Sequence, residues 1–197
     1  FQPCFSPVWD TAIAMQALGE AGCGGHPALL RAAQWLLQRE IRRRGDWSVK
    51  RPHLEPSGWC FEFRNEWYPD IDDTAQVLLG LHAARAPVPD EVRFRALAWL
   101  KGMQSADGGW AAFDADNNWE FLNQVPFADH NAMLDPTCPD ITGRVLEALA
   151  ACGVPPSESC VRRGVQFLTG AQQPDGSWYG RWGVAYIYGT FLALRGL

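Results

Sequence analysis

The sequence predicts an all-α fold, an α/α toroid of repeated helix pairs, of which this chain holds an incomplete part. Two observations support this prediction. One recurring segment ends in Gly-x-Trp, and another starts at Thr and ends at Leu seven residues later. Self-similar segments in a fixed order are typical of repeat architectures, in which each helix pair buries its apolar face against its neighbours.

The Gly-x-Trp segment contains an Arg, an aromatic residue four positions later, a Leu, then Gln or Glu, and finally the turn. Its three copies span residues 31–47, 95–110 and 163–178. Turns such as Ala-Asp-Gly-Gly-Trp stop the helix that precedes them. We expect the Gln side chain to bond free backbone groups at that helix end while it stacks on the Trp of the turn, and so to tie consecutive outer helices together.

The second segment predicts inner helices that begin near its Thr residues. The four copies are Thr11 to Leu18, Thr74 to Leu81, Thr142 to Leu149 and Thr190 to Leu197. An Asp lies one or two positions ahead of three of these Thr residues, at Asp10, Asp73 and Asp140, where a carboxylate can accept bonds from free N–H groups. Amphipathic outer helices would alternate with them. We therefore expect one domain, with repeats at roughly 10–47, 73–110 and 140–178 and the start of another at 184–197.

Composition narrows the range of functions. The net charge of −5 and the scattered Lys and Arg residues, apart from Arg42-Arg43-Arg44, argue against a nucleic-acid partner. No apolar run reaches the roughly 18 residues of a membrane span. The four His and six Cys residues lack zinc-site spacing, so we expect reduced thiols and no metal. The start, Phe1-Gln2-Pro3-Cys4, predicts a segment of a longer protein.

An acidic cluster and an excess of aromatic residues are the unusual features. Asp70-Ile71-Asp72-Asp73 carries three carboxyl groups, and the chain has ten Trp and ten Phe against four Tyr. One Asp is enough to cap the helix expected at Thr74, and we assign that cap to Asp73. If Asp70 and Asp72 face a cavity, like charge and burial raise the pKa of at least one carboxyl group. That group would stay protonated near neutral pH, as a general acid must.

The two features fit one kind of chemistry. Aromatic walls indicate an apolar substrate. Protonation of an alkene, followed by carbocation cyclisation, requires a neutral acid together with ring faces that stabilise cations without attacking them. We therefore interpret the acidic cluster and the aromatic excess as parts of a single site.

The sequence resembles the squalene–hopene cyclases, which are class II triterpene cyclases. Asp70-Ile71-Asp72-Asp73-Thr74-Ala75 is similar to the family's DxDDTA acid motif, and the Gln-to-Trp turns are similar to its QW repeats. Two flanking segments also match, Ser6-Pro7-Val8-Trp9-Asp10 and Gly180-Arg181-Trp182-Gly183. The resemblance runs from Ser6 to about Thr190. It implies protonation of a terminal alkene of squalene and cyclisation to a hopene- or hopanol-type pentacycle. The enzyme class that it implies is an isomerase, or a hydro-lyase for the hopanol product, and no cofactor is implied.

The resemblance also implies roles for the acidic and basic residues. Asp72 would be the proton donor, with Asp70 and Asp73 holding the charge of the cluster. Asp140 and Arg144 fall where the family keeps groups that orient and acidify the donor, although their spacing is equally that of an ordinary helix-surface ion pair. Arg144 replaces the His of the best-known pattern. Because Arg cannot pass a proton on, re-protonation of Asp72 would need water or another group.

Aromatic residues implied to line the substrate site are Trp9, Phe61, Phe113, Trp182 and Tyr188. Phe113 departs from the family, which often has Tyr there. Phe127, followed by Ala128, resembles the narrow point of the substrate channel. Each of these rings can also be an ordinary core residue.

Several alternatives remain open. A sterol-type oxidosqualene cyclase, or a cyclase of another C30–C35 substrate, shares the repeats, but the sterol-type motif lacks the three-Asp cluster. Class I terpene synthases carry a magnesium-binding motif that begins with two adjacent acids, and prenyltransferase β-subunits need an Asp, Cys and His zinc set. A helical scaffold without catalytic activity would present its concave face to proteins.

The resemblance further implies where the protein acts. It would attach to the cytoplasmic side of a prokaryotic cell membrane as a peripheral or monotopic protein, through regions outside this chain, and a homodimer is compatible with it. We expect the isolated segment to be inactive, because the remaining repeats and a second domain would be needed to close the cavity.

Overall fold

The computed structural model describes residues 5–117, 119, 121–122 and 134–197, and within these ranges the regular elements are all helices. They are α1 (Pro7–Leu18), which continues into a π-helical turn (Gly19–Cys23), α2 (Pro27–Leu37), α3 (Trp47–Lys50), α4 (Ile71–Ala83), α5 (Asp90–Gly102), α6 (Pro139–Ala151), α7 (Ser159–Ala171) and α8 (Ala185–Gly196). The predicted all-α class is confirmed. None of the helices in the described ranges is long and apolar enough to cross a membrane.

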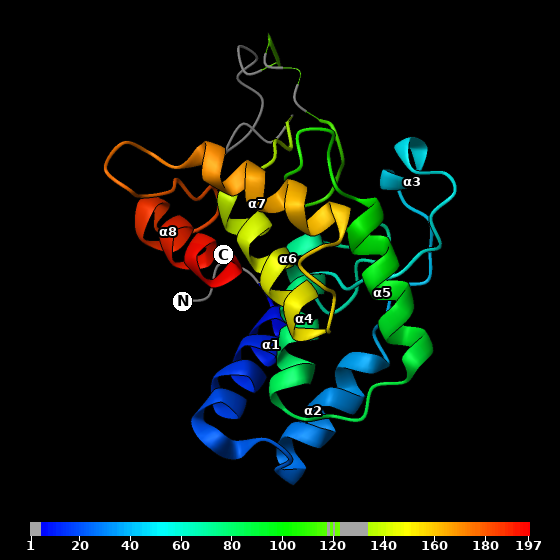
Figure 1. Cartoon of the computed structure of the whole chain (residues 1–197). Coiled ribbons are helices and arrows are strands. Elements are labelled where there is room, and N and C mark those ends of the chain that lie inside the picture. The colour runs from blue at the N-terminus through cyan, green and yellow to red at the C-terminus, as the bar shows by residue number, and fades with distance from the viewer. Residues whose placement is uncertain (1–4, 118, 120, 123–133) are drawn as a thin grey trace.

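The helices form two layers (Figure 1). In the inner layer α1 packs against α4, α4 against α6, and α6 against α8. The outer helices α2, α5 and α7 each cover part of that layer, with α2 on α1 and α4, α5 on α4, and α7 on α6. Every residue of α4 from Ile71 to Leu81 is buried, which explains why this inner helix has small and aliphatic residues on all sides rather than on one face. This alternation is that of an incomplete α/α toroid.

Glycines allow the inner helices to approach each other closely. A Cβ atom added to Gly80 of α4 would lie 2.7 Å from the backbone oxygen of Ala12 in α1. A Cβ atom on Gly143 of α6 would lie 2.2 Å from the backbone oxygen of Leu192 in α8. Both contacts are made to backbone atoms, which cannot rotate away, so any side chain at these positions would push the inner helices apart.

Three turn tryptophans share one set of hydrogen bonds. In each, the indole Nε1–H donates at 2.7 Å to a Leu carbonyl near the end of an outer helix, and the backbone N–H donates at 3.0 Å to a Thr hydroxyl of the next inner helix. The sets are Trp59 with Leu36 and Thr74, Trp110 with Leu100 and Thr142, and Trp178 with Leu168 and Thr190. Each tryptophan thereby fixes the start of an inner helix to the end of the preceding outer helix.

The predicted first turn is wrong, because Trp59 rather than Trp47 occupies this position. Residues 41–57, which include α3, lie between the end of α2 and Gly58-Trp59. Trp47 instead packs edge-on against Trp99, with ring centroids 5.8 Å apart and planes at 88°. The sequence offered two Gly-Trp or Gly-x-Trp candidates after α2, and the nearer one belongs to this inserted segment.

The predicted polar tie between outer helices is confirmed. The Gln104 Nε2 donates to the Gly108 carbonyl at 2.7 Å and to the Cys160 carbonyl at 2.8 Å, so it connects the end of α5 to the start of α7. Arg163 of α7 donates to the Gln104 Oε1. In the preceding unit Arg95 donates to the Glu40 carboxylate at 2.7 Å. The recurring Arg of α5 and that of α7 therefore each bind the Glu or Gln of the turn before their helix.

The inner helices begin three to five residues before the Thr residues at which they were predicted to start. Asp10, Asp73 and Asp140 consequently lie inside the first turn of their helices, and none of them is the N-cap residue. Pro7 and Pro139 take the first helical positions of α1 and α6, where a missing N–H is tolerated.

Replacing Gly143 with Ala should lower the free energy of unfolding by about 1 to 3 kcal/mol, because the new methyl group overlaps the backbone of α8. Chemical denaturation would measure the change. Gly170→Ala in α7 is the matched control, since nothing lies within 4 Å of its Cβ position. There the higher helix propensity of Ala should leave stability unchanged or raise it by up to about 1 kcal/mol. Equal stability of both variants would contradict the close packing of α6 on α8.

Candidate functional site

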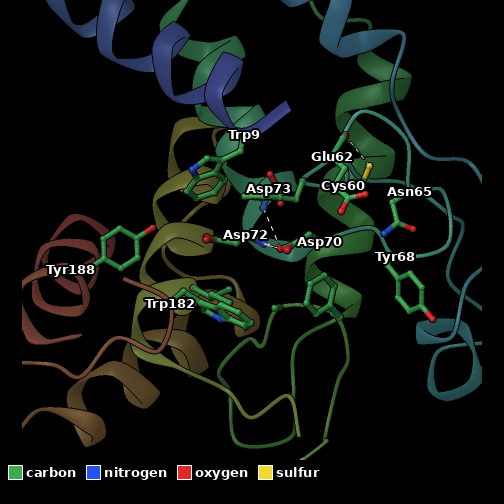
Figure 2. Close-up of a pocket in the computed structure, with 14 residues that line it drawn as sticks. Trp9, Cys60, Glu62, Asn65, Tyr68, Asp70, Asp72, Asp73, Trp182 and Tyr188 are labelled. Carbon is green, nitrogen blue, oxygen red and sulfur yellow. Dashed lines mark hydrogen bonds between the residues drawn. The ribbon is translucent and has the colours of Figure 1, made fainter. Parts of the chain in front are cut away.

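A cavity of about 500 Å³ opens where the inner helices meet the segment that precedes α4. Its walls come from α1, from residues 60–70, from the first turns of α4 and α6, from residues 112–113, and from residues on both sides of the start of α8. Figure 2 shows the Asp72 carboxyl group directed toward the side that holds Tyr188, with the indoles of Trp9 and Trp182 nearby. Residues from six parts of the chain thus form the cavity that contains the acidic cluster.

The cavity brings together most of the residues singled out from the sequence. Its lining includes Asp70, Asp72, Asp73, Trp9, Phe61, Phe113, Trp182 and Tyr188. The rings of Trp9 and Phe61 lie against each other, with centroids 6.3 Å apart. Phe127 lies outside the described residues, so the structure does not place it. Asp140 and Arg144 lie behind the cavity wall, on α6, and are buried.

Asp70, and not Asp73, caps α4. Its backbone is extended, at φ −101° and ψ 133°, and its Oδ1 accepts hydrogen bonds from the backbone N–H groups of Asp72 at 2.7 Å and Asp73 at 3.3 Å. A cap residue must stand just outside the helix, and Asp73 is already its third residue. The assignment of the cap to Asp73 is therefore wrong, and both Asp72 and Asp73 are free of that role.

Asp72 forms a buried ion pair with Arg144. The Arg144 Nε donates to the Asp72 Oδ1 at 2.6 Å, and this contact joins α4 to α6. Arg144 does not pair with Asp140, the neighbour that the i, i+4 spacing suggested. The Asp140 Oδ2 instead accepts a hydrogen bond from the backbone N–H of Trp182 at 3.0 Å. The interpretation of Asp140 and Arg144 as a helix-surface ion pair is wrong, since both side chains are buried and have other partners.

The remaining N–H groups of Arg144 donate hydrogen bonds to two other side chains. Its Nη2 donates to the Tyr188 hydroxyl at 2.5 Å, and its Nη1 donates to the Gln76 Oε1. The guanidinium carbon lies 4.9 Å from the centre of the Trp9 ring, a cation–π distance. One buried cation therefore contacts the acidic cluster and two of the aromatic side chains of the cavity.

Burial raises the pKa values of all three carboxyl groups of the cluster. Burial and the charge of Asp72 raise the pKa of Asp70 to about 8. Burial, with the charges of Asp70 and Asp72, raises the pKa of Asp73 well above its usual range. Burial also raises the pKa of Asp72, although the charge of Arg144 opposes that rise. The cluster thus retains at least one proton near neutral pH, next to an apolar cavity.

Among the residues of the site that were not foreseen, three have chemistry or contacts that bear on its function. Cys60 lines the cavity, and burial raises the pKa of its thiol. Gln76 is buried beside Arg144, and a Gln four residues after Asp72, followed by the apolar run from Val77 to Leu81, was a usable signal. Asp135 accepts hydrogen bonds from the backbone N–H groups of residues 112, 113 and 114, and so it positions Phe113. No sequence pattern indicated that last role.

Replacing Asp135 with Ala should leave three N–H groups without their acceptor, so the segment that carries Phe113 should loosen. We expect a loss of about 1 to 3 kcal/mol in the free energy of unfolding and faster amide exchange at residues 112–114. Hydrogen exchange measured by mass spectrometry would detect this. Asp135→Asn, which keeps one carbonyl oxygen, should show a smaller effect. Unchanged exchange in Asp135→Ala would show that the contacts do not hold the segment.

The raised pKa of Asp70 also predicts a pH dependence of stability. The folded state keeps the proton up to a pKa of about 8, whereas the unfolded chain releases it near 3.8. Folding is therefore favoured at low pH, and the free energy of unfolding should fall between those values by roughly 1 kcal/mol per pH unit. Asp70→Asn keeps a capping oxygen and should flatten the fall in denaturation curves recorded from pH 4.5 to 8.5. An equally steep fall in this variant would refute the prediction.

Comparisons with known proteins agree with this geometry. The family model "Squalene-hopene cyclase C-terminal domain" matches residues 5–197. The squalene–hopene cyclase of Alicyclobacillus acidocaldarius is 47% identical over 196 residues, which cover 96% of this chain and 31% of that protein. The dammaradiene synthase of Dryopteris crassirhizoma is 44% identical over 211 residues, covering all of this chain and 30% of that protein. The chain thus spans about a third of the length of the curated relatives it matches.

A solved structure supports the fold. The apo structure of the type II terpene cyclase MstE from Scytonema superposes with a TM-score of 0.61 at 20% sequence identity. The superposition covers 96% of this chain and 48% of that one. At this identity the likeness concerns the arrangement of helices and not the chemistry.

Proposed function

Because the chain belongs to the squalene-hopene cyclase C-terminal domain family, we propose that the whole protein cyclises squalene to a hopene- or hopanol-type pentacyclic triterpene. The observation that carries the proposal is the position of Asp72. Its carboxyl group lines a cavity with aromatic walls, and the buried Arg144 contacts it at 2.6 Å. Among the described carboxyl groups that line the cavity, Asp72 alone has a cation within ion-pair distance.

In this proposal Asp72 donates the proton that starts the reaction. The O–H bond of its neutral carboxyl group breaks, and the π electrons of the terminal alkene form a new C–H bond at the less substituted carbon. A tertiary cation forms on the other carbon, and further alkenes add to it in turn. Burial raises the pKa of Asp72 and so favours the neutral acid that must form before transfer, while the Arg144 Nε–H stabilises the carboxylate that transfer leaves behind, in the ion pair that the structure shows. Arg144 therefore contributes more after the transfer than before it, which is what lowers a barrier.

Aromatic rings would stabilise the cations that follow. Trp9, Phe61 and Tyr188 present rings to the cavity, and ring faces attract a cation without forming a bond to it. Phe113 and Trp182 lie on the cavity wall as well. The last cation would lose a proton to give the alkene or take up water to give the alcohol. Asp70 and Asp73 would hold the remaining charge and proton of the cluster, and Asp140 would orient the segment that carries Trp182.

The proposal extends to the setting of the reaction. Squalene is insoluble in water, and so the whole protein would take it up at a membrane surface, on the cytoplasmic side, through regions outside this chain. The resemblance is also compatible with a homodimer. Phe127 would lie at the narrow point of the path to the cavity.

The decisive variant is Asp72→Asn in the full-length protein that carries this chain, supplied with squalene. Removal of the general acid should lower pentacycle formation by at least about 100-fold, measured by gas chromatography with mass spectrometry. Asp90→Asn is the matched control, because Asp90 is an exposed aspartate in the first turn of α5. Undiminished product from Asp72→Asn would refute the assignment of the donor.

A second candidate function is favoured by one comparison. The dammaradiene synthase relative is as similar to this chain as several squalene–hopene cyclases are, so a different triterpene skeleton fits the same residues. The product analysis of the unmodified protein separates the two functions. A helical scaffold without catalytic activity would give no cyclised product from either squalene or its epoxide.

A further inference from the structure

We infer that Gln76 is a positioning residue for the acid site: its amide oxygen holds the Arg144 guanidinium against Asp72 without adding a charge. The inference rests on the proposed function. It concerns a residue that does not line the cavity of the acidic cluster, although it borders an adjoining pocket together with Arg144, and its contact with the acid site is made through Arg144.

Gln76 is placed by the helix that carries the acid. It lies on α4 four residues after Asp72, so the two side chains share one face of the helix. Gln76 is fully buried, with 0% of its surface exposed. A buried amide without hydrogen-bond partners destabilises the folded state. The Gln76 amide therefore needs specific partners inside the protein.

The orientation of the amide is fixed at both ends. The Gln76 Oε1 accepts a hydrogen bond from the Arg144 Nη1, and the Gln76 Nε2 donates to the Gln16 Oε1 of α1 at 2.7 Å. Gln16 in turn donates to the Glu20 carboxylate at 3.0 Å. Turning the Gln76 amide over would set its NH₂ group against a guanidinium that can only donate. The chain of contacts therefore presents an acceptor to Arg144.

Arg144 needs that acceptor. A guanidinium has donors on three nitrogens and no acceptor, and Arg144 is only 5% exposed. Asp72 accepts from Nε, Tyr188 accepts from Nη2, and Gln76 accepts from Nη1. Without Gln76 the Nη1 donors of Arg144 would lose their acceptor, and the guanidinium could rotate away from Asp72. An imidazole at this position, with two nitrogens, would need one acceptor fewer.

The neutral charge of Gln76 matters as much as its oxygen. The ionisable groups around Asp72 and Arg144 include Asp70 and Cys138 at the N-caps of α4 and α6, Asp73 on α4, Asp140 on α6 and Tyr188 on α8, and Glu147 and Arg195 lie beyond Gln16. Arg144 is thus the one cation that contacts Asp72 among the described residues. A second carboxylate on Arg144 would share its charge and weaken its hold on the Asp72 carboxylate. The Gln76 amide accepts a hydrogen bond from the Arg144 Nη1 without carrying a negative charge. Among the described carboxyl groups, the guanidinium therefore contacts Asp72 alone.

Gln76→Glu and Gln76→Leu in the full-length protein test the inference. Gln76→Leu removes the acceptor and should lower kcat by at least about 10-fold with little change in KM, because the cavity wall is untouched. Gln76→Glu keeps the shape and should move the alkaline limb of the kcat profile to higher pH by about half a unit or more, because Asp72 becomes a weaker acid. Gln34→Glu, an exposed Gln on α2, is the control that should move neither value.

A readout that does not depend on activity separates this inference from the proposed function. The Asp72 carboxyl carbon can be titrated by ¹³C nuclear magnetic resonance and assigned through Asp72→Asn. A higher Asp72 pKa in Gln76→Glu than in the unmodified protein supports the placement even if no squalene is cyclised, in which case only the proposed function fails. An unchanged Asp72 titration in Gln76→Glu overturns the inference even if the protein is an active cyclase. If Gln76→Leu does not fold, Gln76→Glu decides alone.

Discussion

The ion pair between Asp72 and Arg144 is the interaction on which the arrangement of the site depends. It lies in the interior, where two charges are stable only if their remaining donors and acceptors are also satisfied. Arg144 meets that condition by reaching three side chains, from Asp72 and Gln76 on α4 to Tyr188 on α8, and Gln76 extends the network to α1. All four inner helices must therefore be in register before the pair can form, so the site is built into the core rather than added to its surface.

The repeat frame supplies that register. Close approach at Gly80 and Gly143 sets the spacing of the inner helices, and the turn tryptophans fix where each helix starts. The frame also contacts the site directly, because the backbone N–H of Ile71, at the start of α4, donates to the Ala112 carbonyl at 2.7 Å, two residues after the turn Trp110. The residues that fix the helices and the charged residues of the acid site are neighbours in sequence but have separate roles.

The sequence was sufficient for the fold class and for most of the cavity lining, because repeats and motifs depend on local spacing. It misplaced the cap of α4 because capping depends on which residue has extended backbone angles, and Asp70 and Asp73 are equally good caps by residue type. It chose Trp47 because an inserted segment supplied a second Gly-x-Trp. The role of Gln76 could not be assigned before Arg144 and α1 were seen beside it, since the partners of a buried amide are distant in sequence.

The central claim is that the acidic cluster stores a proton at neutral pH beside an aromatic cavity. Infrared difference spectroscopy of the protein at pH 7, between the unmodified chain and its Asp-to-Asn variants at positions 70, 72 and 73, tests that claim most directly. The account predicts a protonated carboxyl band in the unmodified protein that at least one of these variants removes. A spectrum with only ionised carboxylates from these three positions would contradict the account, because no acid would then be available to protonate an alkene.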